Sequence, residues 1–137
     1  MTCGRALAVA FSLGVSLLQA QTLLPPGYTI TTIAGTNYAG AGGKAVNAPL
    51  AAVEGLATDA AGNVYISDAG DHRVRKVSTT GTIVTLAGNG AAGLRGDKGP
   101  SNEAQLNRPY GLAVDPYGQI LIADLGNQRI RRIGTDG

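Results

Sequence analysis

Short runs of β-branched and aliphatic residues alternate with Gly-containing turns along most of the chain. The runs are too short for helices and fit strands, and they cover Leu56–Asp59, Val64–Ser67, Arg73–Val77 and Thr82–Ala87. Between them, Ala60–Asn63 and Thr79–Gly81 have the composition of hairpin turns. This pattern predicts four consecutive antiparallel strands joined mostly by tight turns.

The strand pattern is repeated. Residues 55–77 recur as residues 111–133 without a gap, at a shift of 56 positions (111 − 55). Ten positions are identical, and they include the pairs Asp68/Asp124, Arg73/Arg129 and Arg75/Arg131. Average residue usage would give roughly one or two identities by chance. Self-similarity at a fixed period indicates a repeat architecture.

The segments around these two repeat cores also correspond to each other. Tyr28–Ala34 is rich in β-branched residues and predicts another strand, which a Gly- and Ala-rich loop, Gly35–Leu50, follows. In the corresponding second loop, Asn102–Leu106 predicts one helical turn with Ser101 as its N-cap. Leu106 would then pack between neighbouring sheets.

A single four-stranded meander is poorly stable, whereas stacking such sheets around an axis buries both faces of each. The sequence therefore predicts an all-β fold made of β-propeller blades. Residues 28–137 supply one complete blade, three strands of a second and one isolated strand, which is an incomplete ring. We expect the N-terminal piece of a longer chain, because open sheet edges are costly. The alternative is self-association, for example three two-blade chains in one six-bladed ring.

The N-terminus has the pattern of a secretory signal peptide. Arg5 precedes the uncharged apolar run Ala6–Leu18, and Ala20 is a small residue at a plausible cleavage site. A membrane anchor would need roughly 20 apolar residues. We predict a signal peptide at residues 1–20, cut after Ala20, a linker at 21–27, and a secreted or periplasmic mature protein without a membrane segment. Cleavage would remove Cys3, the one cysteine, and with it any thiol chemistry.

The repeat resembles the NHL-repeat family, in particular secreted bacterial members. The resemblance rests on Gly55–Asp59, Gly62-Asn63, Ser67-Asp68 and His72–Arg75, and on their second copies. Asp71 departs from the family pattern, which often has Asn there. The resemblance implies a propeller, commonly six-bladed. It does not imply one activity, because NHL propellers serve as binding modules and also as lyase-type enzymes.

The repeated charged residues are the first candidates for chemistry. Asp68 and Asp124 end the second strand of each unit, and an Arg follows each of them five residues later. We interpret these Asp and Arg residues as structural pairs that link strands, because a catalytic group need not recur in each copy. The same interpretation extends to the second Arg of each strand, whose stem would cover apolar surface while its head group pairs or meets water. The structural repeat positions are thus Asp68, Arg73, Arg75, Asp124, Arg129 and Arg131.

Other chemistry has weaker support in the sequence. His72 is the one histidine and lacks the partner ligands that a metal site needs, so we predict a loop residue there and no metal or cofactor. A formal charge of +2 argues against a nucleic-acid partner. The Gly-rich segment Gly88–Pro100 lacks a phosphate-loop motif, and it is long enough to shape a ligand-facing surface.

Two functions remain open at this point. The first is an exported, non-enzymatic scaffold that binds a protein, peptide or glycan, and this one is favoured because it needs only loops. The alternative is the N-terminal part of a secreted propeller enzyme of the lyase or lactonase type, with a metal at the central axis. The alternative requires axis-facing ligands from several blades.

Overall fold

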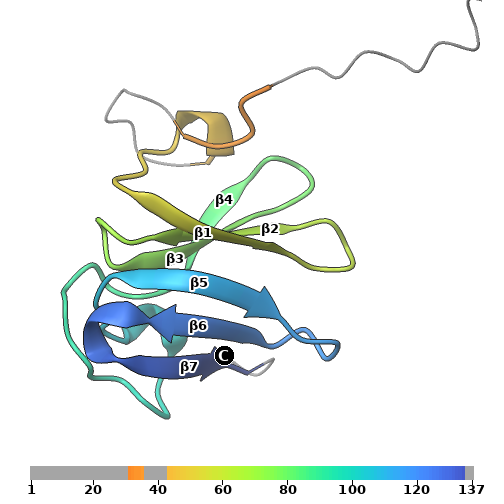
Figure 1. Cartoon of the computed structure of the whole chain (residues 1–137). Helices are drawn as coiled ribbons and strands as arrows, with labels where there is room; N and C mark the ends of the chain where they lie inside the picture. Colours follow the sequence, from red (N-terminus) through yellow and green to blue (C-terminus); the bar gives the residue numbers. More distant parts are fainter. Residues whose placement is uncertain (1–30, 36–42, 135–137) are drawn as a thin grey trace, which may run out of the picture. The chain divides into compact units, whose positions relative to one another are not determined.

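The computed structural model describes residues 31–35 and 43–134, and residues 32–137 belong to one compact unit. The described elements are all strands and short 3-10 helices (Figure 1). In chain order they are η1 (Ala45–Asn47), β1 (Val53–Thr58), β2 (Val64–Asp68), β3 (Arg73–Val77), β4 (Ile83–Ala87), η2 (Ser101–Glu103), β5 (Pro109–Val114), β6 (Ile120–Asp124), η3 (Leu125–Asn127) and β7 (Arg129–Ile133). The all-β prediction is confirmed.

The first sheet has the order β1-β2-β3-β4, and each neighbouring pair is antiparallel. Gly62 and Gly81 have φ values of 85° and 79° in the two hairpin turns, a conformation that other residues rarely adopt. The four-stranded meander predicted from the sequence is therefore confirmed. The bounds of β3 match the predicted strand, whereas β1 begins earlier, at Val53.

The second sheet repeats the first as far as its third strand, with the order β5-β6-β7. Gly118 takes the place of Gly62, with a φ of 81°. The next connection also repeats, since His72 and Gln128 have φ values of 53° and 55°. One four-stranded and one three-stranded blade were expected, and both are found.

The two blades pack face to face, with β1 beside β5 (Figure 1). Leu106 is 1% exposed and lies between the sheets, as predicted, against Tyr65 and Val74 of the first blade and Ile122 of the second. At one end of the interface the backbones almost touch. A Cβ on Gly55 would come within 2.1 Å of the Tyr110 carbonyl oxygen, so only glycine fits there.

The segment before β5 differs from the prediction. The helical turn begins at Ser101 and ends at Glu103, and Ser101 is not its N-cap. The Ser101 hydroxyl instead donates a hydrogen bond of 2.7 Å to the carbonyl of Leu86. This bond ties η2 to β4. The Ser101 side chain does not cap the helix, because Ser101 lies within η2 and its hydroxyl bonds to the neighbouring sheet.

The structure describes only part of the N-terminal segments for which predictions were made. Of the strand predicted at Tyr28–Ala34, residues 31–34 are described, and they form no ladder; Ile33 and Ala34 make a bend. A strand needs a paired neighbour, and β1 to β4 complete their sheet without this segment. The signal peptide at 1–20 and the linker at 21–27 lie outside the described residues. Within the described ranges, no helix is long and apolar enough to cross a membrane.

Candidate functional site

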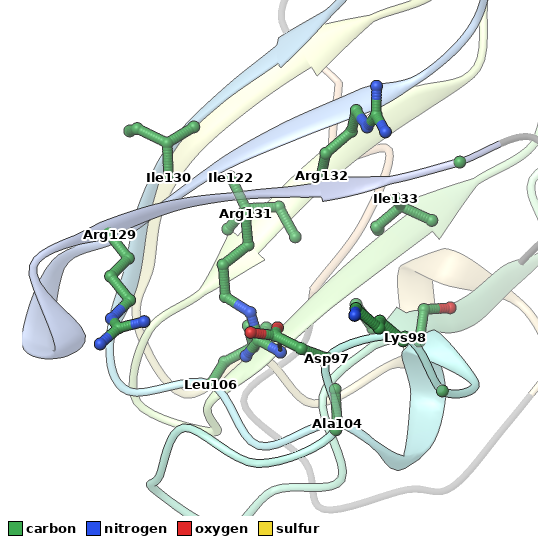
Figure 2. Close-up of a pocket in the computed structure, with 15 residues that line it drawn as sticks. Asp97, Lys98, Ala104, Leu106, Ile122, Arg129, Ile130, Arg131, Arg132 and Ile133 are labelled. Atoms are coloured by element: carbon green, nitrogen blue, oxygen red, sulfur yellow. Dashed lines mark hydrogen bonds and ion pairs between the residues drawn. The ribbon is translucent and has the colours of Figure 1, made fainter.

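A pocket of about 650 Å³ follows strand β7 (Figure 2). The Gly-rich loop between the blades forms one wall through residues 96–99, and β7 forms the opposite wall. Its lining is Ala87, Gly96, Asp97, Lys98, Gly99, Ser101, Ala104, Leu106, Ile122, Arg129, Ile130, Arg131, Arg132, Ile133 and Gly134. The loop that the sequence singled out as a ligand-facing surface therefore does border a pocket.

The floor of the pocket is apolar and has a counterpart in the first blade. There, Ile83 of β4 is 6% exposed and belongs to an apolar cluster in which six other residues have counterparts in the pocket lining. These residues and their pocket counterparts are Ala34/Ala87, Ala45/Ser101, Ala48/Ala104, Leu50/Leu106, Ile66/Ile122 and Val77/Ile133. In the second blade no described residue occupies the place of Ile83. The pocket is thus the slot that a fourth strand fills in the first blade.

One wall of this slot is an open strand edge. In the first blade β3 pairs with β2 on one side and with β4 on the other. In the second blade β7 pairs with β6, and its other edge has no ladder partner among the described residues. That edge presents backbone N–H and C=O groups that can hydrogen-bond to an added strand.

Charged groups line the rim of the slot rather than its floor. Arg131 donates hydrogen bonds to Asp97, at 2.6 Å, and to the carbonyl of Gln105, at 2.5 Å. Figure 2 shows Ile130 and Arg132 on one side of β7, and Arg131 with Asp97 on the other. Arg129, Arg132 and Lys98 are exposed. The rim is basic, and solvent screens most of its charges.

The repeated Asp residues are structural, but not through the expected pairs. Asp68 is 0% exposed, and its Oδ1 accepts hydrogen bonds from the backbone N–H groups of Ala51 and Ala52, at 2.9 and 3.0 Å. Asp124 is also 0% exposed and accepts the N–H of Asn107 at 2.7 Å. Each Asp therefore ties the loop before its blade to the end of the second strand. The sequence spacing could not reveal these partners, because they lie 16 or 17 residues away.

The Arg residues also have other partners than predicted. Arg73 pairs with Asp71 and donates to the carbonyl of Asn89 at 2.9 Å, so it does not pair with Asp68. Arg131, not Arg129, lies near Asp124, with 3.6 Å between Nη1 and Oδ2. Arg129 is the ladder partner of Asp124, and Arg131 lies two residues later, so it points to the same side of β7 as Arg129. In the second blade, the second Arg of the strand is thus the one that reaches the buried carboxylate, whereas Arg75 of the first blade lies 3.8 Å from Asp71.

The turn after β2 and the turn after β6 differ in one side chain, which is Asp71 in the first blade and Asn127 in the second. Asn127 donates from Nδ2 to Asp124 Oδ2, at 2.7 Å, and to the carbonyl of Gly93, at 2.6 Å. Its counterpart is Asp71 (127 − 56), which has no side-chain N–H. Among the described residues, Asp68 Oδ2 is buried without a hydrogen-bond partner. The departure from the repeat pattern at Asp71 therefore leaves one buried acceptor unsatisfied.

His72 has a structural contact. Its Nδ1 accepts the backbone N–H of Arg108 at 3.1 Å, which joins the first blade to the loop before β5. In the part of the chain that the structure describes, no group of three His, Cys, Asp or Glu residues could hold a metal ion. The loop role predicted for His72 agrees with this contact.

Two further titratable groups meet at the β1–β2 turn. Asp59 accepts hydrogen bonds from the Asn63 side chain, at 2.7 Å, from the Asn63 backbone, at 2.9 Å, and from the Tyr65 hydroxyl, at 3.0 Å. The bond from the Asn63 side chain contributes most to lowering the Asp59 pKa to about 2. Burial, and then the bond to Asp59, raises the Tyr65 pKa to about 12. These groups stabilise the turn and lie outside the pocket.

The sequence predicted three strands for the second blade, but it did not predict that the inter-blade loop and β7 border a pocket there. Its lining comes from residues 87 to 134, which only the fold brings together. The signal in the sequence was the strand count, because β4 contains Ile83 and has no counterpart after residue 133 in this sequence.

Comparison with known proteins supports the repeat assignment. The family model "NHL repeat" matches residues 106–133. Human teneurin-4 is 35% identical over 102 residues, which cover 65% of this chain and 4% of that protein. A structural genomics protein from Bacteroides thetaiotaomicron superposes with a TM-score of 0.62 at 30% identity, over 67% of this chain and 23% of that one. An auxiliary nutrient binding protein from the same organism gives 0.57 at 25% identity, over 74% and 28%.

The chain thus spans a small part of these proteins, about a quarter of each solved structure and far less of teneurin-4. What it shares with them is the blade: antiparallel strands with a recurrent turn pattern, stacked face to face. Residues 106–133 thus match the NHL repeat, and the fold of the described chain is that of β-propeller blades.

Proposed function

We propose that this chain is a non-catalytic interaction scaffold of an exported NHL-repeat propeller, and that it binds an extended polypeptide in the slot beside β7. The observation that carries the proposal is the pairing of an open strand edge with an apolar floor whose counterpart, in the first blade, holds a strand. Strand addition to an exposed sheet edge is a general mode of peptide recognition. It favours a protein or peptide over a glycan.

The first blade indicates which peptide the slot fits. Strand β4 pairs Ile83 with Val77 in the ladder and buries the Ile83 side chain. The next residue, Val84, is 50% exposed. A matching ligand would therefore carry a β-branched apolar residue that points inward, and it would tolerate many residues that point outward.

The repeated charged residues support a role without catalysis. Asp68 and Asp124 each accept hydrogen bonds from backbone N–H groups of the preceding loop. Arg131 is engaged by Asp97 and by the Gln105 carbonyl. These groups are used to hold the blades and the inter-blade loop, so the scaffold role explains why they recur.

Two further points support a binding role. The similar protein from Bacteroides thetaiotaomicron is described as an auxiliary nutrient binding protein. Export is part of the proposal and is supported by the apolar run Ala6–Leu18 after Arg5. Outside the cell, a scaffold of this kind would present its slot to other exported polypeptides.

The test is binding of a labelled peptide that copies Thr82–Gly88 to the purified chain, followed by fluorescence anisotropy. We expect saturable binding. The matched control is the same peptide with Ile83→Asp, which places a charge over the apolar floor. Burying an Ile side chain contributes about 1.5–3 kcal/mol, so the control peptide should bind at least about tenfold more weakly. Equal binding of the two peptides, or none of either, would refute the proposal.

A further inference from the structure

We propose that Asn89 and Gly90 form a self-modification site, at which the Asn89 side chain cyclises onto the Gly90 nitrogen and is then hydrolysed. These two residues are the one Asn-Gly pair in the sequence, and they lie near the start of the inter-blade loop that follows β4. A glycine after asparagine leaves the backbone nitrogen unshielded, because it has no Cβ. The site belongs to the joint between the blades and does not depend on the slot beside β7.

The reaction consumes water and no other reactant. The Gly90 nitrogen gives its proton to solvent and bonds to the side-chain carbon Cγ of Asn89. The bond between Cγ and Nδ2 then breaks, and Nδ2 leaves as ammonia after it takes up a proton. Water next opens the five-membered imide. Cleavage between Cγ and the nitrogen gives an ordinary Asp residue, and cleavage between the backbone carbonyl carbon and the nitrogen gives isoAsp.

Two contacts polarise the groups that react. The backbone N–H of Ala91 donates to Asn89 Oδ1 at 2.9 Å. This bond draws electrons from Cγ and stabilises the negative charge that Oδ1 gains when Cγ is attacked. The Arg73 guanidinium donates to the Asn89 backbone carbonyl at 2.9 Å. Because that carbonyl shares its peptide group with the Gly90 nitrogen, the cationic donor makes the Gly90 N–H a better proton donor.

The bond to Ala91 also sets the direction of the Asn89 side chain. It closes a ring that runs from Oδ1 through Cγ and the Gly90 nitrogen to the Ala91 N–H, which is an Asx-turn. The side chain thus curls back over the peptide bond that it attacks. Among the described residues the Gly90 N–H has no hydrogen-bond acceptor, so its proton can pass to solvent. Asn89 is exposed, and water therefore reaches both the amide and the imide.

The fold favours a glycine at position 90, although this residue makes the site reactive. Gly90 has a φ of 93°, which other residues rarely adopt. A Cβ on Gly90 would lie 2.6 Å from Nη2 of Arg73 and would displace the guanidinium that donates to Asn89. The backbone N–H of Asn89 is held by the Ala104 carbonyl at 2.9 Å. The reactive pair and its cationic donor therefore share one fixed arrangement.

The reaction changes the joint between the blades. The Asn89 side chain donates from Nδ2 to the Glu103 carbonyl at 3.2 Å, and this bond ties the loop to η2. A carboxylate has no N–H to donate, so two acceptors would face each other there. The new negative charge would lie beside Arg73, which already pairs with Asp71. The isoAsp product also adds a carbon atom to the backbone, so we expect both products to loosen η2 from the loop.

The experiment follows the purified full chain at neutral pH over time by mass spectrometry of the peptide that contains Asn89. The folded chain should convert faster than the same chain in denaturant, because only the folded chain has the contacts from Arg73 and Ala91. Arg73→Gln should slow the conversion at least about tenfold, since it removes a hydrogen bond from a charged donor. Arg75→Gln removes the same charge from the same strand, where Arg75 lies 3.8 Å from Asp71, and should convert at the unmodified rate.

A second readout is the release of ammonia, which should match the loss of the Asn89 amide and should vanish in Asn89→Ser. Circular dichroism checks that each variant keeps its strands. The inference is overturned if the folded chain converts no faster than the denatured chain, or if Arg73→Gln converts as fast as Arg75→Gln. If Arg73→Gln does not fold, the comparison of the folded and denatured unmodified chain still decides. Binding of the Thr82–Gly88 peptide is a separate measurement, so failure here leaves the proposed function untouched.

Discussion

Replacing Asp71 with Asn should stabilise the protein, although it removes an ion pair. In the second blade, Asn127 donates to the buried Asp124 Oδ2 at 2.7 Å. In the first blade, Asp71 cannot donate, and among the described residues Asp68 Oδ2 has no partner. Asp71→Asn supplies the missing N–H at the equivalent position of the turn.

The expected magnitude is the difference between two terms. A buried polar atom without a hydrogen bond costs about 1–3 kcal/mol. Asp71 loses its ion pair with Arg73, whose side chains are 37% and 29% exposed, and a longer one of 3.8 Å with Arg75. Such partly exposed pairs contribute about 0–1 kcal/mol. We therefore expect Asp71→Asn to raise the free energy of unfolding by about 1 kcal/mol. In a domain of this size that shift raises Tm by about 4 °C.

The assay is urea and thermal unfolding followed by far-UV circular dichroism, with two comparison variants. Asp71→Ala removes the same carboxylate but adds no donor, so it should leave stability unchanged or lower it by up to about 1 kcal/mol. Asn127→Asp makes the reverse change in the second blade. It removes the donor to both Asp124 and the Gly93 carbonyl and places a second carboxylate beside a buried one, so we expect a loss of at least about 2 kcal/mol.

The comparison of Asp71→Asn with Asp71→Ala decides whether the reasoning holds. If the two variants are equally stable, the gain comes from removing a negative charge and not from the hydrogen bond to Asp68. If Asp71→Asn is less stable than the unmodified protein, the ion pair with Arg73 outweighs the unsatisfied oxygen. Either result would refute the argument built on the Asn127 geometry.

Three further predictions use the same unfolding assay. The Asp59 pKa of about 2 lies below its ordinary value of 3.8, so its stabilisation is present above pH 3.8 and is lost as the pH falls toward 2. Asp59→Asn should flatten that acid decline, and a variant that declines like the unmodified protein would contradict this. The Tyr65 pKa of about 12 lies above its ordinary value of 10.0, so the free energy of unfolding should decline as the pH rises from 10 to 12. A Tyr65→Phe variant whose stability declines equally over this range would contradict this. Leu106→Ala should cost about 2–5 kcal/mol, because Leu106 is 1% exposed between the sheets, whereas Leu125→Ala, at 54% exposed, should cost far less.

The sequence predicted the strands well because each signal is local. Apolar runs and a glycine at a positive φ, such as Gly62 and its repeat Gly118, define a hairpin within a few residues. The prediction of Leu106 between the sheets succeeded for a related reason, since the repeat showed that the loop returns to the blade. Packing between consecutive blades follows from the strand order alone.

The partners of the charged residues could not be predicted in the same way. Asp68 and Arg73 face each other in the ladder, which agrees with their spacing, yet the carboxylate turns to the amides of Ala51 and Ala52. Arg131 reaches Asp97 across 34 residues of sequence. Such contacts depend on how the inter-blade loop folds back, and composition and periodicity do not determine that path. The three-stranded second blade was predicted, but the pocket was not, since the loop supplies one of its walls.

The slot corresponds to the position that Ile83 fills in the first blade, and this indicates which ligands it should select. Arg129 and Arg132 at the rim are exposed, so solvent weakens their attraction for an acidic ligand. The floor residues Ile122 and Ile133 are already buried, so the gain comes from burying the apolar side chain of the ligand itself, at roughly 25 cal/mol per Å² of apolar surface. A strand with a β-branched residue at the Ile83 position therefore gains by burying that residue, whereas a charged peptide gains little from the exposed rim. The slot should select its occupant by strand pattern and shape, the same properties that hold β4 in the first blade.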